Sequence, residues 1–151
     1  MSHDGRATSN ESELQPIPAI EPGSVEVRVA AVVENLAMLR TLVAAAAAFE
    51  DFDLDVVADL RLAVDEACTT LIGAAVLGST LVVVLESRPS EFVLHAATTC
   101  GDGDPFDRGG FSWHVLSSLV DEVSTSTSAG SSTEHGLVSI SLLTRRASLY
   151  Q

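Results

Sequence analysis

The sequence predicts an α+β fold: a two-layer α/β sandwich in which helices cover one face of a mixed, mostly antiparallel sheet. Several segments with strand-like patterns follow one another without an intervening helix, as antiparallel strands do. The segments with helical periodicity come in separate blocks, which favours one helical layer over the two layers of a doubly wound sheet. The predicted order is strand, helix, helix, strand, strand, loop, helix, loop, strand.

The first half of the chain is predicted to form an arm, one strand and two helices. Residues 1–23 are polar and proline-containing, which is typical of a flexible N-terminal arm. In SVEVRVA (24–30), valines alternate with polar residues at the period of a half-buried strand. In 32–49 and 54–75, apolar residues recur every three or four positions, and this spacing predicts two amphipathic helices.

The second half is predicted to hold a hairpin, a third helix and a last strand. TLVVVLES (80–87) and FVLHAAT (92–98) flank the turn sequence RPSE and read as two strands. The remaining elements are a loop at 100–110, a helix at 111–123, a polar loop at 124–136 and a strand at 137–144. The folded domain is therefore expected to span 24–146, with a C-terminal tail at 147–151.

Composition excludes several classes of function. The 151 residues carry 21 acidic and 8 basic side chains, a formal charge of −13, so nucleic acid and anionic membranes are not expected as partners. All the basic residues are arginine, which excludes chemistry that needs a lysine amine. Two cysteines, no apolar run of membrane-spanning length and no visible secretion signal predict a cytoplasmic protein.

The second predicted helix holds the first candidate site. Glu66 and Thr70 lie four residues apart in LRLAVDEACTTLIGAA and therefore share a helix face, away from the apolar stripe. A carboxylate beside a hydroxyl could bind Mg²⁺ through oxygen ligands or orient a water molecule. The plainer interpretation is a solvated glutamate beside a surface threonine.

The loop CGDGDPFDRGG is the second candidate. Its glycines, which include Gly101, Gly103 and Gly110, would let a ligand approach the backbone closely, and the start of the next helix would attract a phosphate. Three aspartates in the same loop oppose a phosphate. The plainer alternative is an exposed loop without a ligand.

In this order, the segments resemble a known family. DLRLAVDEACTTLI is similar to the N-box of the GHKL (Bergerat-type) ATPases, in the form found in RsbW-type anti-sigma factors, which are serine-protein-kinase-like. The segment ENLAMLRTLVAAAAAFEDFDLDVVADLRLAVDEACTTLI and the later FSWHVL resemble the mycobacterial anti-sigma-F branch of that family. The resemblance extends over nearly the whole predicted domain and implies a GHKL fold.

The resemblance also implies an ATP site, of which this sequence keeps only part. Glu66 stands where the family has its general base, and Thr70 replaces the asparagine that binds Mg²⁺. In the Asp-x-Gly-x-Gly motif both glycines remain, but Thr99 replaces the adenine-binding aspartate. The phosphate loop that follows in the family reads Gly110-Phe111-Ser112-Trp113 here, with one glycine lost. The cofactors implied are ATP and Mg²⁺, but these departures predict weak or absent nucleotide binding and little or no kinase activity.

The function implied is that of a cytoplasmic anti-sigma factor. It would bind an alternative, stress-type sigma factor, act as a homodimer and be released by an anti-anti-sigma protein. Arg40 in LAMLRTLV holds the place of the arginine that contacts sigma in the family. Two alternatives remain: an active serine kinase with Glu66 as its base, and a GHKL-fold binding module without a sigma partner.

Overall fold

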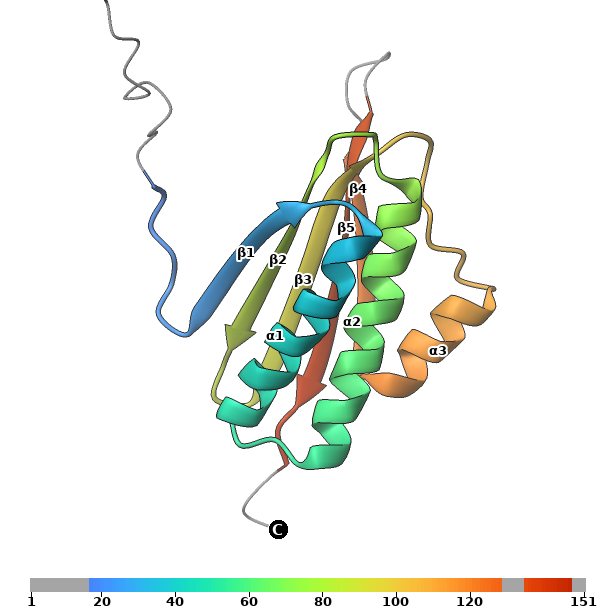
Figure 1. Cartoon of the computed structure of the whole chain (residues 1–151). Helices are drawn as coiled ribbons and strands as arrows, with labels where there is room; N and C mark the ends of the chain where they lie inside the picture. Colours follow the sequence, from blue (N-terminus) through green and yellow to red (C-terminus); the bar gives the residue numbers. More distant parts are fainter. Residues whose placement is uncertain (1–16, 129–134, 148–151) are drawn as a thin grey trace, which may run out of the picture.

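The computed structural model describes residues 17–128 and 135–147. They form one five-stranded sheet in the order β1-β2-β3-β5-β4, and every neighbouring pair is antiparallel. Figure 1 shows the three α-helices lying on one face of this sheet. The elements are β1 (Ser24–Ala30), the 3₁₀ turn η2 (Val33–Asn35), α1 (Leu36–Phe49), α2 (Leu54–Ala74), β2 (Thr80–Ser87), β3 (Glu91–Cys100), α3 (Phe111–Leu119), β4 (Glu122–Ser128) and β5 (Gly136–Arg145).

The core lies between the sheet and the helices. Alternate residues of β2, β3 and β5 point toward the helices and are buried, because successive side chains of a strand face opposite sides. Helix α1 contributes Leu39, Val43 and Ala47, which are four residues apart and share one face. Helix α2 contributes a longer buried stripe: Leu60, Ala63, Val64, Ala67, Cys68 and Leu71. The predicted two-layer α+β arrangement, with helices on one face, is thus confirmed.

Two details of the predicted fold are wrong. The sheet is fully antiparallel among the described residues, not mixed. The third helix ends at Leu119, not at residue 123, and Glu122–Ser128 forms the edge strand β4 where the sequence predicted the end of a helix and a loop. Pairing with β5 makes this segment a strand. Its Ser and Thr side chains bury little apolar area, but the hydrogen bonds to β5 satisfy its backbone N–H and C=O groups.

The N-terminal arm and the C-terminal tail predicted from the sequence lie partly outside the described residues. The arm predicted at 1–23 is described from residue 17, and the tail predicted at 147–151 is described only at residue 147. Residues 17–21 have no regular structure, whereas the Gly23 carbonyl accepts a hydrogen bond from the Ser87 amide, at the start of the sheet. Among the described residues, no helix is long and apolar enough to cross a membrane.

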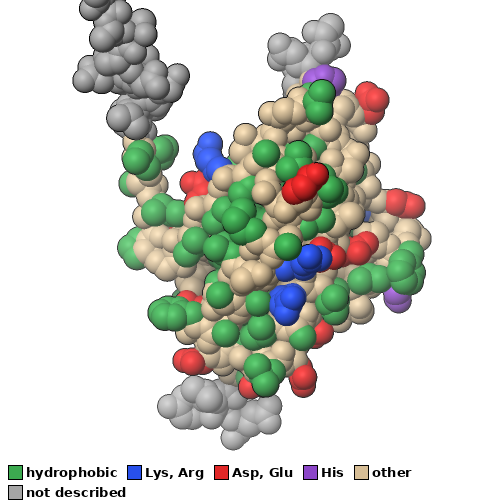
Figure 2. All heavy atoms as spheres, viewed as in Figure 1, with side chains coloured by type: hydrophobic (Ala, Val, Ile, Leu, Met, Phe, Trp, Pro, Cys, Tyr) green, Lys and Arg blue, Asp and Glu red, His purple; other side chains and the backbone are tan. Residues whose placement is uncertain are grey.

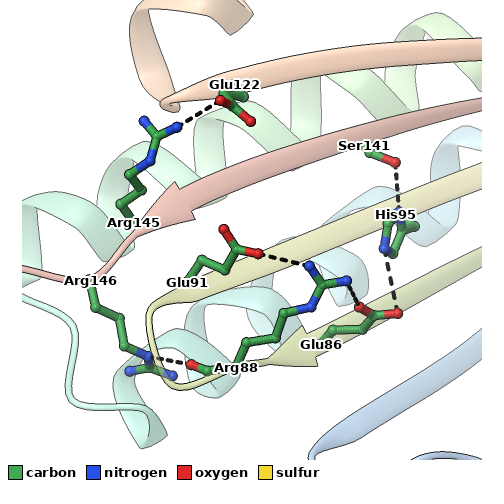
Figure 3. Close-up of polar contacts among 8 residues, drawn as sticks. All are labelled: Glu86, Arg88, Glu91, His95, Glu122, Ser141, Arg145 and Arg146. Carbon is green, nitrogen blue, oxygen red and sulfur yellow. Dashed lines mark hydrogen bonds and ion pairs between the residues drawn. The ribbon is translucent and has the colours of Figure 1, made fainter.

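The face of the sheet opposite the helices carries a row of polar contacts. His95 Nδ1 lies 2.6 Å from Ser141 Oγ, and its Nε2 lies 3.6 Å from a Glu86 carboxylate oxygen (Figure 3). Arg88 bridges Glu86 and Glu91. Its hydrogen bond is the main reason why the pKa of Glu86 is lowered. Apart from Arg88, which lies in the turn between β2 and β3, these residues come from β2, β3 and β5, so the contacts tie neighbouring strands together on the open face.

Arg146 fastens the end of β5 to the end of α1. Its guanidinium donates to the Glu50 carboxylate at 2.8 Å and to the Ser87 hydroxyl at 2.8 Å, and it stacks 4.9 Å from the centre of the Phe52 ring. It also donates to the Arg88 carbonyl, a contact drawn in Figure 3. The Ser87 hydroxyl in turn donates to Glu50, and this hydrogen bond is the largest of the effects that lower the pKa of Glu50. The Arg146 cluster therefore favours a charged Glu50.

Replacing Glu50 by glutamine is expected to lower the free energy of unfolding at pH 7 by about 1 kcal/mol. Since the folded pKa lies below the ordinary 4.5, the carboxylate stabilises the fold above pH 4.5 and loses this effect as the pH falls through the folded pKa. Urea unfolding at pH 7 and at about pH 3 should show the two proteins converging in acid. Glu34→Gln, at an exposed position, serves as control, and an equal difference at both pH values would contradict the assignment.

Candidate functional site

Glu66 and Thr70 lie on the side of α2 that faces away from α1. The neighbouring residue Asp65 bonds to Arg40 of α1, and each step along a helix turns about 100°, so Glu66 points toward the α3 side. Helix α2 packs against both α1 and α3. Glu66 and Thr70 are half-buried there, one helical turn apart. The structure thus brings together the two residues that the sequence placed on one helix face.

The Thr70 hydroxyl already has a partner within the helix. It donates to the Glu66 carbonyl at 3.0 Å, the bond that a helical threonine commonly makes to the preceding turn. The hydroxyl oxygen keeps a lone pair that could coordinate a metal ion. Glu66 is, however, the one carboxylate beside it on this face of the helix, so the two residues alone offer few ligands. Within 17–128 and 135–147, no group of three or more His, Cys, Asp or Glu side chains could hold a metal ion.

The structure places the Thr99 side chain away from Glu66 and Thr70. In β3, Thr98 and Cys100 are buried toward the helices, so alternation puts Thr99 on the open face with Ala97 and His95. The Thr99 backbone faces the end of α2, where its carbonyl accepts a hydrogen bond from the Val76 amide. The helix-side position belongs to Thr98, whose hydroxyl donates to the Thr80 carbonyl at 2.9 Å. The sequence did not single out Thr98, although the alternation of side chains along the strand would have placed it on the helix side.

The glycine loop between β3 and α3 is closed by its own aspartates. Asp104 accepts a hydrogen bond from the Phe106 amide at 2.8 Å, and Asp107 accepts one from the Gly109 amide at 3.0 Å. A Cβ atom on Gly110 would lie 3.1 Å from both the carbonyl oxygen and a carboxylate oxygen of Asp107, so a side chain there would crowd Asp107. Backbone donors that could hold a phosphate are therefore partly occupied, and a negative charge lies beside the start of α3.

The other two glycines of the motif differ in their structural roles. Gly103 adopts a φ of 62°, a left-handed conformation that glycine accepts without strain. Gly101 has open space around it, so packing does not require a glycine there. Its carbonyl lies 3.3 Å from His135 Nδ1, and its amide donates to the Ala74 carbonyl at the end of α2. Gly101 thus joins the loop to the C-terminal end of α2.

Ser112 and Trp113 lie in the first turn of α3, directly after this loop. Trp113 packs edge-on against Phe106, with ring centres 6.5 Å apart, and Arg108 lies 5.3 Å above the indole ring. The Trp113 side chain therefore holds the loop against α3. The Ser112 hydroxyl is buried and has no hydrogen-bond partner among the described residues.

Arg40 forms an ion pair that the sequence did not predict. Its Nη1 atom lies 2.9 Å from the Asp65 carboxylate, and the side chains are 37% and 34% exposed, so both remain accessible to a partner. Arg61 and Leu62 are exposed on the neighbouring surface of α2. Arg40, Arg61, Leu62 and Asp65 are called the α1–α2 surface below. Figure 2 shows basic side chains among hydrophobic ones over these helices.

Comparison with known proteins gives one clear relationship. No family model matches the chain. Two curated proteins of Mycobacterium tuberculosis, from strains CDC 1551 / Oshkosh and ATCC 25618 / H37Rv, are each named anti-sigma-F factor RsbW and are 54% identical to this chain over 102 residues. The match covers 68% of this chain and 61% of each relative, which is less than two thirds of their length. The chain is thus similar over 102 residues to proteins named anti-sigma-F factor RsbW.

Proposed function

We propose that this protein is an anti-sigma factor that binds an alternative, sigma-F-like sigma factor and keeps it from RNA polymerase. The observation that supports this function is the 54% identity to proteins named anti-sigma-F factor. We further propose that the two-layer α+β domain is a GHKL fold and that the protein acts in the cytoplasm. An anti-anti-sigma protein would compete for it and release the sigma factor, so that the protein regulates transcription negatively in a stress response.

The arrangement of the candidate site favours binding over phosphotransfer. A kinase must hold the γ-phosphate in line with its acceptor and neutralise the charge that develops. Here the Thr99 side chain points to the open face, and Asp107 adds negative charge at the start of α3. Binding of a sigma factor needs only a docking surface. The α1–α2 surface provides exposed apolar and charged groups of both signs.

Electrostatics is compatible with such a partner. The chain carries a formal charge of −13, and a sigma factor presents basic DNA-binding regions. Opposite charges would speed the encounter of the two proteins and would be screened by salt.

A serine kinase that modifies the anti-anti-sigma protein is the second candidate. One observation favours it: Glu66 and Thr70 share the face of α2 that turns toward α3, as a base and a Mg²⁺ ligand would. The glycine loop and the start of α3 lie on the same side of the molecule (Figure 1). A GHKL-fold binding module without a sigma partner is a third candidate, and failure to bind any sigma factor would favour it.

We expect the unaltered protein to bind a sigma factor equally well with and without ATP·Mg²⁺, and to phosphorylate no partner. Calorimetry with purified sigma-F of M. tuberculosis as the probe, with and without ATP·Mg²⁺, tests the first part. Incubation with radiolabelled ATP and an anti-anti-sigma protein tests the second. Glu66→Ala should leave sigma binding unchanged, because Glu66 points toward the α3 side of α2, away from the α1–α2 surface. Phosphorylation that is lost in Glu66→Ala would overturn this proposal in favour of the kinase.

A further inference from the structure

A serine, a histidine and a glutamate lie side by side on the open face of the sheet, away from the candidate site (Figure 3). Ser141 of β5 is directly opposite His95 of β3, and Glu86 of β2 lies diagonally on the other side of the histidine. Ser141 Oγ is 2.6 Å from His95 Nδ1, and a Glu86 carboxylate oxygen is 3.6 Å from His95 Nε2. A hydroxyl within reach of an imidazole that a third group orients is the arrangement of an activated nucleophile.

Glu86 decides which nitrogen of His95 carries the proton. An ionised carboxylate accepts hydrogen bonds and donates none, so it favours a proton on the Nε2 atom that faces it. Glu86 is held in its charged form because Arg88 donates to it at 2.6 Å, and this hydrogen bond is the main cause that lowers the pKa of Glu86. The lone pair of neutral His95 therefore lies on Nδ1, and the Ser141 hydroxyl donates its hydrogen to it. In this tautomer His95 can take the proton of Ser141 when the serine oxygen attacks an electrophile.

Solvent and small reagents can reach this pair. The His95 side chain is 35% exposed, and Figure 1 shows the three described α-helices on the opposite face of the sheet. Toward the start of β5, the side chains beside Ser141 on the open face are small: Ser139, Ser124 and Ala97. An acyl group can therefore approach the Ser141 oxygen from that side.

The rest of the chain offers few competing targets for an acyl donor. Lysine amines are the usual sites of acetylation in proteins, and this chain has no lysine. Both cysteines are buried, and burial raises the pKa of the Cys68 thiol to about 12, so little reactive thiolate is present. Among the described residues, Ser141 has the one hydroxyl that is hydrogen-bonded to an imidazole. Its chemistry is therefore distinct from that of the other serines on this face.

We propose that Ser141 is a nucleophilic serine that accepts an acyl group from small activated esters, with His95 as its general base. Glu86 is a positioning residue, because its carboxylate lies against the far nitrogen of the ring and stabilises the imidazolium ion that forms. The site lies on the face of the sheet opposite the helices, whereas the α1–α2 surface lies on the helices. The proposal is therefore independent of sigma binding.

The step transfers one acyl group and one proton. The hydrogen of Ser141 Oγ passes to His95 Nδ1 while Oγ forms a bond to the carbonyl carbon of the ester. The bond between that carbon and the leaving oxygen breaks, and the leaving group keeps the electron pair. His95 then gives its proton to the leaving group or to water. The products are an ester of Ser141 and the free alcohol or phenol.

Reaction of the full chain with p-nitrophenyl acetate tests the assignment. Release of p-nitrophenol gives the rate, and mass spectrometry of peptides at early times gives the site. We expect an acetyl group on Ser141, and His95→Phe should slow its formation about a hundredfold, the lower end of what a positioned general base contributes. Ser141→Ala should abolish this product.

Ser139→Ala is the matched control. Ser139 lies on the same strand and the same face, but its hydroxyl is paired with Ser126 at 2.7 Å rather than with a histidine. This variant should acetylate Ser141 as fast as the unaltered protein does. Equal rates in the unaltered protein and His95→Phe, or acetylation of Ser139 in preference to Ser141, would overturn the proposal.

A pH profile separates positioning by Glu86 from simple support of the sheet. The rate of acetylation should rise with pH as His95 loses its proton, because only the neutral ring can accept one. Glu86→Gln removes the charge that stabilises the imidazolium ion, so the midpoint of this rise should move to lower pH. Glu91→Gln is the control, since Glu91 also pairs with Arg88 at 2.8 Å but has no contact with His95.

The other charged groups on this face stay in place in the Glu86 variant. Among the described residues they are Glu26 and Arg28 of β1, Arg88 in the turn, Glu91 of β3, Glu122 of β4 and Arg145 of β5. A change in the midpoint therefore reports on the Glu86 charge. A midpoint that is unchanged in Glu86→Gln, or that moves as far in Glu91→Gln, would overturn the role of Glu86.

Discussion

Reversing the charge of Arg40 is expected to weaken the capture of a sigma factor about thirtyfold or more. Central arginines in protein interfaces often contribute 2 kcal/mol or more to binding, which corresponds to such a change in the dissociation constant. Arg40 is only 37% exposed and is held by Asp65 at 2.9 Å, so its guanidinium is positioned before a partner arrives. Calorimetry of Arg40→Glu with sigma-F as the probe measures the loss.

A second variant separates docking from folding. Arg40→Glu alone also places a carboxylate beside Asp65, which could disturb the contact between α1 and α2. The double variant Arg40→Glu/Asp65→Arg exchanges the charges and restores the internal ion pair, so its free energy of unfolding should return toward that of the unaltered protein. Sigma binding should remain weak in the double variant. Full recovery of binding would show that Arg40 acts only by holding the helices, and would refute its docking role.

Replacing Phe92 by alanine is expected to lower the free energy of unfolding by about 3–5 kcal/mol. Phe92 is 2% exposed on the helical side of β3, and its ring packs edge-on against Phe52, with centres 5.7 Å apart. The ring also lines an open cavity beside β1, so truncation would enlarge an existing space that the surrounding backbone cannot fill. Urea unfolding at pH 7 provides the measurement.

Phe111→Ala is the matched control for this prediction. Phe111 is 82% exposed at the start of α3, so its removal should change the free energy of unfolding by no more than about 0.5 kcal/mol. A loss at Phe92 no larger than the loss at Phe111 would show that the helical layer does not pack on β3 as described.

The sequence predicted the elements whose pattern is strong and local. The valines of β1 and the apolar stripes of α1 and α2 repeat at one period over their whole length, and periodicity of this kind follows from the backbone geometry alone. Strand β4 was missed for the opposite reason. Its Ser and Thr side chains give little hydrophobic signal, and its order comes from hydrogen bonds to β5, whose partner residues lie 9 to 21 positions further along the chain.

The candidate site shows the same division. Glu66 and Thr70 share a face because a helix fixes residues four apart, and the sequence alone determined this. The motif spacing that paired Thr99 with them took no account of the strand's alternation, which turns the Thr99 side chain to the open face. The sequence predicted that the loop's aspartates would oppose a phosphate, and the structure shows that Asp107 is the one that lies against Gly110 at the start of α3.

The sequence by itself determined the α+β class, the single helical layer and the similarity to proteins named anti-sigma-F factor RsbW, because these depend on periodicity and residue identity along the chain. Only the tertiary structure decided that Arg40 is paired with Asp65, that the five described strands pair antiparallel throughout and that β1 is the terminal strand in their order. Each of these depends on which distant segments meet. Contacts between distant segments depend on how the core packs and on which backbone groups hydrogen-bond to each other. A local sequence pattern does not specify either.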